Sequence, residues 1–269
     1  MSTAVFEVAR SIPARIQELK RLTKLANELV EKDEDSYNTL CRACCVLLAA
    51  HLEGFVKELG QNLFLDLNFH VHSFSKMPAA MQRTFCEKIA FYQGVEQADI
   101  DQRIKQLIAF FSTQNVSIDL DAFTYKENRN RNPGPDVIES AFAKLGVPSM
   151  MQSVSDGLFD NIFKNDTSLT FCLRRDIRRF QSLLYKFPYK LLPETYKFNY
   201  KVKPRQAGGA GLWQAFIEEV MRRRHSIAHG DTVANESNPT ELNADIEKLE
   251  VLMYAILYSS TTYLCKSYR

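Results

Sequence analysis

The stretch Leu40-Cys41-Arg42-Ala43-Cys44-Cys45-Val46-Leu47-Leu48 decides the fold class, because its apolar side chains recur at helical spacing. With the residues that follow, one helical stripe contains Cys41, Cys44, Cys45, Leu48, Leu52 and Phe55. Free cysteine packs as a small hydrophobic residue, and no second Cys or His pair with zinc-ligand spacing follows Cys41-x-x-Cys44. The sequence therefore predicts a core helix here and not half of a zinc site.

Helical periodicity extends through most of the chain. Residues 14–31 and 35–65 predict a helical hairpin, and residues 212–227 predict a third long helix. The segment Asn238-Pro239-Thr240-Glu241 can cap and start a fourth, because Asn caps, Pro fits the first turn and Glu completes a capping box. Shorter helices are expected around 79–92, 98–114, 135–145 and 168–185, loops at 126–135 and 206–211, and short strand pieces near 196–202.

Two long helices at each end of the chain predict one domain over residues 1–269. The expected fold is all-α, with a four-helix bundle core formed by residues about 12–65 and 212–267. Residues about 66–205 form a large, mostly helical insertion, because a long excursion must return to the same bundle.

The composition indicates a globular, soluble protein. Of the 269 residues, 45% are hydrophobic and 25% are charged. The longest uninterrupted apolar run, Ala43–Ala50, is shorter than the roughly 18 residues of a membrane span, and the N-terminus lacks the pattern of a secretory leader. We therefore expect a cytoplasmic protein that does not enter a membrane.

The net charge of +2 is unevenly spread along the chain. Residues 171–205 contain ten basic and two acidic side chains, interleaved with tyrosine and phenylalanine. Such a segment suits a polyanion with stackable bases, but it also suits a solvated helix face above core aromatics. The composition alone leaves both interpretations open.

The most direct chemical signal is Arg224-His225-Ser226-Ile227-Ala228-His229-Gly230, called here the Arg–His motif. A guanidinium can bind phosphate oxygens without losing its charge, and an imidazole can transfer a proton near neutral pH. Both properties suit phosphodiester cleavage. The same residues also make an ordinary helix C-terminus, where cations offset the helix dipole and Gly takes the left-handed cap.

The Arg–His motif resembles the Arg-polar-x-x-x-His signature of HEPN domains, a superfamily of α-helical proteins rich in RNases and toxins. Residues 47–59, 132–147 and 239–242 are similar, in the same order, to elements of the RiboL-PSP-HEPN branch. Residues 153–205 do not match that pattern. The residue after the arginine is often Asn in such families, whereas it is His225 here.

The resemblance implies a metal-independent endoribonuclease, in which the 2′-hydroxyl of RNA attacks the adjacent phosphate. His229 would be the general acid or base, Arg224 would bind the phosphate, and His225 would orient the phosphate or relay a proton. Glu53 would support Arg224 or set a histidine tautomer, unless it is an exposed acid that pairs with Lys57. The predicted RNA contacts are Arg174, Arg175, Arg178, Arg179 and Arg223.

No metal or other cofactor is expected. His225 and His229 have the spacing of a zinc-binding helix, but zinc catalysis would need a third ligand and usually a nearby Glu base, and Asp231 is the only adjacent candidate.

The spacing within the motif adds a geometric condition. Arg224 and His229 are five residues apart, which places them about 140° apart around a regular helix. Either the helix loosens before Gly230 or the two residues meet across two chains, and the resemblance implies a homodimer with a composite active site. It also implies a toxin or anti-phage effector, held in check by an antitoxin or another defence-system partner. The alternative is a non-catalytic protein that binds RNA or nucleotide, or that acts as a scaffold for an antitoxin.

Overall fold

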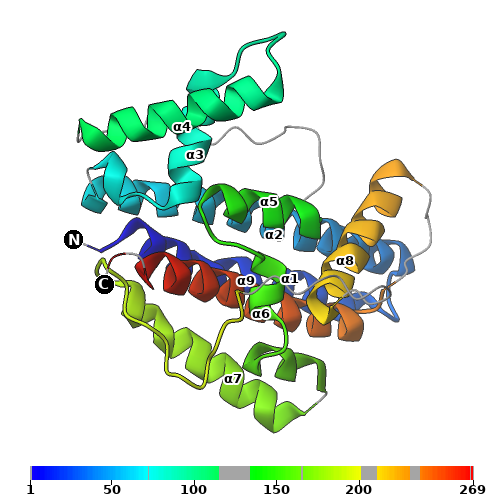
Figure 1. Cartoon of the computed structure of the whole chain (residues 1–269). Coiled ribbons are helices and arrows are strands. Elements are labelled where there is room, and N and C mark those ends of the chain that lie inside the picture. Colours follow the sequence, from blue (N-terminus) through cyan, green and yellow to red (C-terminus); the bar gives the residue numbers. More distant parts are fainter. Residues whose placement is uncertain are drawn as a thin grey trace.

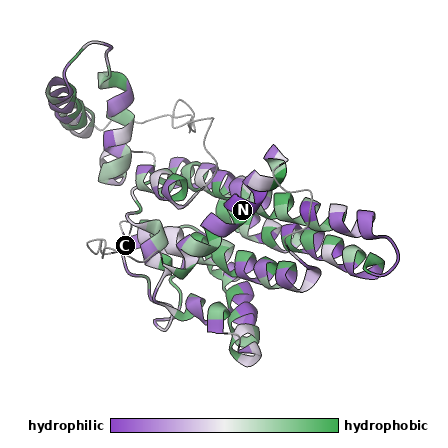
Figure 2. Cartoon of the chain, turned by 90° about the vertical axis from the view of Figure 1, so that its right-hand side faces the viewer, coloured by the Kyte–Doolittle hydropathy of each residue, from purple (hydrophilic) through white to green (hydrophobic). Residues whose placement is uncertain are grey.

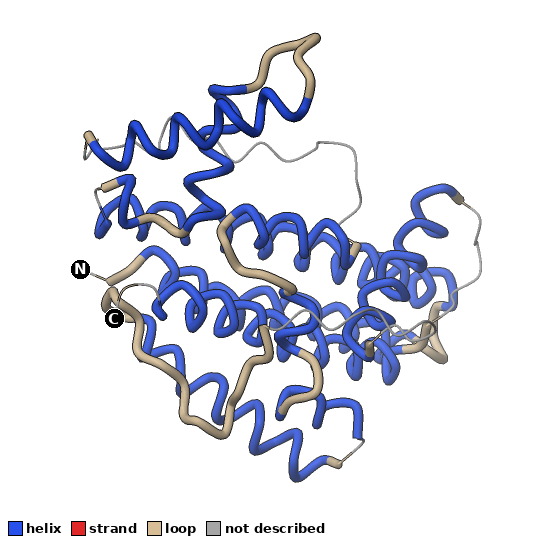
Figure 3. The backbone as a smooth tube through the Cα atoms, in the orientation of Figure 1, coloured by secondary structure: helices blue, strands red, loops and turns tan. Residues whose placement is uncertain are grey.

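The computed structural model describes residues 2–71, 73–114, 134–164, 166–200, 211–230, 237–266 and 268. All regular elements in these residues are helices, which confirms the predicted all-α class (Figures 1 and 3). In chain order they are α1 (Ala4–Leu29), α2 (Glu34–Val71), η1 (Phe74–Lys76), α3 (Ala79–Ala90), α4 (Gln97–Thr113), α5 (Pro135–Lys144), α6 (Met150–Val154), η3 (Leu158–Lys164), α7 (Thr167–Arg179), η4 (Phe180–Leu184), α8 (Leu212–His229) and α9 (Pro239–Lys266).

The core forms around α2, which packs against α1, α8 and α9. The predicted stripe on α2 is confirmed, since Cys41, Cys44 and Leu52 are fully buried and the other members of the stripe are at most 5% exposed. Helix α9 is enclosed by its neighbours and packs against both α1 and α2. These four long helices form the predicted bundle core, and the elements from η1 to η4 form the helical insertion.

Helix α1 begins ten residues earlier than the sequence pattern indicated, at Ala4. Pro13 lies inside the helix, where its missing N–H leaves the carbonyl of Ala9 without its usual helical donor. The side-chain amide of Gln181 lies 3.4 Å from that carbonyl oxygen and donates to it. The N-terminus of α1 is held by buried Asp66, whose carboxylate accepts hydrogen bonds from the backbone N–H groups of Ala4 and Val5 at 2.7 and 3.0 Å.

The start of α9 follows the predicted capping box. The Asn238 side chain accepts from the backbone N–H of Glu241 at 3.0 Å, and the Glu241 carboxylate accepts from the backbone N–H of Asn238 at 3.2 Å. These reciprocal bonds satisfy two of the donors that a helix start leaves open.

The insertion departs from the prediction at two places. The segment predicted as one helix over 168–185 changes from α-helix to 3₁₀ geometry after Arg179, and residues 196–200 form no strand. The alternation of Tyr196, Phe198 and Tyr200 resembles a strand, but these rings pack on the helical core, where the hydroxyl of Tyr200 donates to the Ser259 carbonyl at 2.9 Å. The predicted loop residues 126–133 and 206–210 lie outside the described residues.

Helices α3 and α4 pack against each other and stand apart from the main body in both views (Figures 1 and 2). Colouring by hydropathy shows apolar and polar residues alternating around most helices, as expected where one face of each helix is buried (Figure 2).

One helix in the described part of the chain, α2, is long and apolar enough to cross a membrane. The core helix of a soluble protein passes the same test, and the stripe of α2 that packs on α1, α8 and α9 is buried inside the molecule. This position is consistent with a soluble protein.

Candidate functional site

The Arg–His motif forms the last turns of α8. The helix continues without interruption to His229 and ends at Gly230, whose φ of 73° lies in the left-handed region that favours glycine. The backbone N–H of Gly230 donates to the carbonyl of Ile227 at 3.2 Å. The interpretation as an ordinary helix C-terminus is therefore confirmed at the level of local structure, and the helix does not loosen before Gly230.

The two histidines of the motif lie side by side on the surface. His225 and His229 are both exposed, and their ring centroids are 4.1 Å apart with an interplanar angle of 50°. Arg224 is half-buried and lies about 100° around the helix from His225 and about 140° from His229. Among the described residues no hydrogen bond or ion pair joins Arg224 to either ring.

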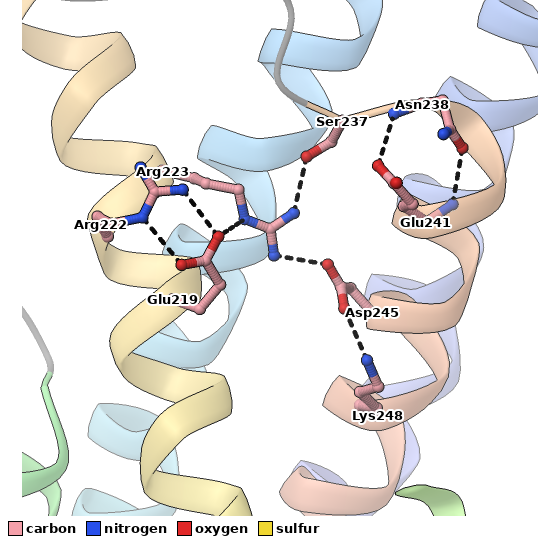
Figure 4. Close-up of polar contacts among 8 residues, drawn as sticks. All are labelled: Glu219, Arg222, Arg223, Ser237, Asn238, Glu241, Asp245 and Lys248. Atoms are coloured by element: carbon pink, nitrogen blue, oxygen red, sulfur yellow. Dashed lines mark hydrogen bonds and ion pairs between the residues drawn. The ribbon is translucent and has the colours of Figure 1, made fainter. Parts of the chain in front are cut away.

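Arg223, one residue before the motif, faces the interior (Figure 4). Its side chain donates from Nη1 to Ser237 Oγ at 2.9 Å and from Nη2 to Asp245 Oδ2 at 2.5 Å. Its Nε lies 3.3 Å from Glu219 Oε1, within ion-pair range but not aligned for a hydrogen bond. With 7% of its surface exposed, Arg223 is not placed to make the RNA contact expected from the sequence.

The contacts of Arg223 continue into a network at the junction of α8 and α9. Burial is the largest single effect on the pKa of Arg223 and lowers it, but the hydrogen bond to Asp245 and the negative charges around the guanidinium together outweigh burial, and the net pKa is raised. Asp245 also accepts from Lys248 Nζ at 3.1 Å, and Glu219 accepts two hydrogen bonds from Arg222, each at 2.9 Å (Figure 4). This Arg223 network joins the end of α8 to the start of α9, and so fixes the helix end that carries the motif.

The predicted basic surface on α7 is largely neutralised by acids. Arg174 and Arg178 both pair with Glu250 of α9, a carboxylate with no exposed surface, at 2.7 and 2.5 Å. Arg174 also pairs with Glu247. These two arginines therefore hold α7 against α9.

The other two arginines of α7 lie on its outer side. Arg175 is exposed and pairs with its neighbour Asp176 at 3.1 Å. Arg179 is exposed at the end of α7, and its side chain has no ion pair among the described residues. Of the four arginines predicted to bind RNA through α7, Arg179 alone is exposed and has no ion pair among the described residues.

Glu53 lies exposed on α2, and within the described residues no hydrogen bond or ion pair joins it to Arg224. The acids that do organise this region are Asp245 and Glu250, which the sequence interpretation did not select. Asp245 has an apolar neighbour on each side, Ala244 and Ile246, and Glu250 lies between Leu249 and Val251. A charge in such a setting indicates a buried carboxylate that needs a cationic partner.

An all-α domain with four long core helices, the third of which ends in an Arg–His motif, has the architecture of a HEPN-type domain. The family model of RiboL-PSP-HEPN matches residues 11–259, and the chain belongs to this family. The matched range also spans residues 153–205, which the motifs found in the sequence did not relate to the family. No curated protein and no solved structure matches the chain.

Proposed function

We propose that the protein is a metal-independent endoribonuclease whose active site is built from the Arg–His motif. Membership of a HEPN family indicates an RNA-related function of the kind that RNases carry out. The observation that carries the proposal is the position of the motif, with two exposed imidazoles and a half-buried guanidinium at a helix end that the Arg223 network holds in place.

The proposed chemistry uses only groups of the protein and the RNA. The 2′-hydroxyl attacks the adjacent phosphorus, the bond to the 5′-oxygen breaks, and a 2′,3′-cyclic phosphate forms. His229 carries out one of the two proton transfers, from the attacking 2′-hydroxyl or to the leaving 5′-oxygen, and His225 or water carries out the other; such a role contributes about 10²–10⁴-fold. Arg224 donates to the non-bridging oxygens, on which charge builds. His225 orients the phosphate or relays a proton.

A second copy of the chain completes the proposed site. Because α8 stays regular through His229, Arg224 and His229 of one chain face different directions. A two-fold dimer that places two α8 ends against each other would bring Arg224 of one protomer to His229 of its partner. We therefore propose a homodimer with a composite cleft.

The biological setting we propose is that of a cytoplasmic toxin or anti-phage effector. A nuclease of this kind would need restraint in its own cell, so an antitoxin or another defence-system protein is the proposed regulatory partner. RNA is the proposed substrate, with Arg179 and Arg175 on the outer side of α7 as its first contacts outside the motif.

The decisive experiment incubates RNA in EDTA with the wild-type protein and with the His229→Ala and Arg224→Ala variants. We expect cleavage by the wild type, since no metal takes part, and loss of at least about 100-fold in the His229→Ala variant. Arg222→Ala is the matched control, because Arg222 is an exposed arginine of the same helix whose guanidinium pairs with Glu219. It should cleave like the wild type.

Two outcomes would overturn the proposal. Equal cleavage by the wild type and His229→Ala would mean that a contaminating nuclease, or another site, does the chemistry. RNA binding without cleavage by the wild type would point to the alternative function, a non-catalytic RNA-binding or scaffold protein.

A further inference from the structure

The two exposed imidazoles at the end of α8 form a pair with its own chemistry. The regular helix places His225 and His229 on one face, four residues apart, and the ring centroids are separated by 4.1 Å. Both side chains are exposed, and neither ring has a hydrogen bond or ion pair among the described residues.

We propose that His225 and His229 bind a divalent transition-metal ion such as Zn²⁺ through one nitrogen of each ring, and that the bound ion suppresses RNA cleavage. Two nitrogens at 2.0–2.1 Å from a tetrahedral Zn²⁺ lie roughly 3.3 Å from each other. The ring centroids are 4.1 Å apart, and both side chains are exposed, so each ring can rotate to bring one nitrogen to that spacing. Among the described residues no third His, Cys, Asp or Glu joins the pair, so water would fill the other coordination positions and the site would bind more weakly than a zinc site with three or four protein ligands.

The charges around the pair do not oppose a cation as strongly as the run of three arginines suggests. Arg222 donates two hydrogen bonds to Glu219, and Arg223 is buried against Asp245. Arg224 lies about 100–140° around the helix from the two rings. Imidazole favours Zn²⁺, Cu²⁺ and Ni²⁺, whereas Mg²⁺ prefers oxygen ligands, so the site discriminates by ligand chemistry.

Suppression of cleavage follows from which atoms the ion occupies, and this part rests on the proposed function. A ring nitrogen of His229 that coordinates a metal has no lone pair with which to accept a proton. The bound ion therefore removes the general acid or base and acts as an inhibitor, not as a cofactor.

The binding test is a calorimetric titration of Zn²⁺ into metal-free protein, with wild-type, His225→Ala, His229→Ala and His70→Ala chains. We expect either motif variant to weaken Zn²⁺ binding by about tenfold or more, because one of two ligands is lost. His70→Ala is the matched control, since His70 is also an exposed histidine on a helix. It should bind like the wild type, and Mg²⁺ should give no binding heat. Equal affinity in all four chains, or a loss confined to His70→Ala, would overturn the site.

Zinc titrated into the RNA cleavage assay tests the suppression separately. We expect wild-type cleavage to fall as the motif site fills and to return on addition of EDTA. Zinc binding at the pair with unchanged cleavage would overturn the inhibitory role. A chain that binds Zn²⁺ through His225 and His229 but cleaves no RNA would remove the proposed nuclease and keep the metal site, so the two failures are distinguishable.

Discussion

Arg223 and Arg224 are neighbours in sequence but differ in burial, since Arg223 is buried and Arg224 is half-buried. Successive residues on a helix point about 100° apart, so the guanidinium of Arg223 enters the junction of α8 and α9 while Arg224 turns away from it. The sequence alone could not separate the members of the Arg222-Arg223-Arg224 run, because the partner that selects Arg223 is Asp245, on a different helix. The position of the motif at a helix end could be predicted from the sequence, but the buried contacts that support it could not.

Removal of the Arg223 guanidinium should destabilise the fold strongly. Arg223→Ala leaves Asp245 buried with only part of its pairing, which typically costs about 3–5 kcal/mol. Arg222→Ala is the control, and its exposed pair with Glu219 should contribute less than about 1 kcal/mol. Urea denaturation of both variants measures the difference. Equal losses would mean that Arg223 does not hold the two helices together.

The cysteines should differ sharply in reactivity. Of the six, Cys172 alone is exposed, whereas burial raises the pKa of Cys44 to about 12 and that of Cys86 to about 11. Because the thiolate is the reactive form, we expect a thiol reagent to modify the native protein at Cys172 and to reach the other five only after denaturation. Mass spectrometry of the labelled chain reads this directly. Rapid labelling of Cys41, Cys44 or Cys45 in the native protein would contradict the buried stripe on α2.

At the scale of elements, α7 shows how far a charge pattern can be interpreted without its partners. The basic composition of residues 171–205 left two interpretations open, a polyanion surface and a solvated helix face. In the structure the arginines of α7 have two different roles. Arg174 and Arg178 form ion pairs with buried Glu250, whereas Arg179 is exposed on the surface. That division depends on Glu250, which lies 76 residues after Arg174 in the chain.

Two alanine variants of α7 should separate these roles. Arg179→Ala should leave stability within about 0.5 kcal/mol of the wild type. It should also make the slope of log RNA affinity against log salt concentration shallower by about 0.7, the value for one lost phosphate contact.

Arg174→Ala should instead destabilise the fold by about 2 kcal/mol or more, because buried Glu250 then loses one of its two arginine partners. Filter binding over a salt series and urea denaturation give the two readouts. An unchanged salt slope for Arg179→Ala would show that this arginine makes no phosphate contact.

Periodicity predicted correctly those helices whose apolar residues fit helical spacing and no other. Residues 35–65 lie within α2, and the capping box at Asn238 marks the start of α9. The predictions are wrong where contacts with distant parts of the chain override the local sequence pattern. The pattern placed the first helix at residues 14–31, but α1 begins at Ala4 and runs through Pro13, and Gln181 donates to the carbonyl that Pro13 leaves without its helical donor. Alternating aromatics at 196–200 suggest a strand, but a helical core accepts their rings.

For the whole molecule, we predict that buried tyrosine hydroxyls and cysteine thiols cause a loss of folding stability at alkaline pH. Burial raises the pKa of both Tyr254 and Cys44 to about 12, from ordinary values of 10.0 and 9.0. Above the ordinary value the unfolded chain has lost the proton that the folded chain keeps. The unfolded state then binds fewer protons, and stability falls as pH rises, by up to about 1.4 kcal/mol per pH unit for each group.

Urea denaturation over a pH series tests this alkaline dependence. Tyr254→Phe should flatten the decline between about pH 10 and 12, whereas Tyr92→Phe, at an exposed tyrosine, should not. Identical profiles for both variants and the wild type would mean that Tyr254 does not contribute to the pH dependence.

The composite site makes the sharpest prediction at this scale, because it requires two copies of the chain. A heterodimer of one Arg224→Ala chain and one His229→Ala chain, purified through two different tags, still contains one intact Arg224 and one intact His229 on opposite protomers. If the site forms across the interface, one of two symmetry-related sites is complete, and the heterodimer should cleave RNA at about half the wild-type rate. Each homodimer variant should be inactive. If each site instead lay within one chain, both sites of the heterodimer would carry a lesion, and it would be as inactive as its parents. The unbroken helix through His229 favours the first outcome, because it leaves Arg224 and His229 of the same chain facing apart.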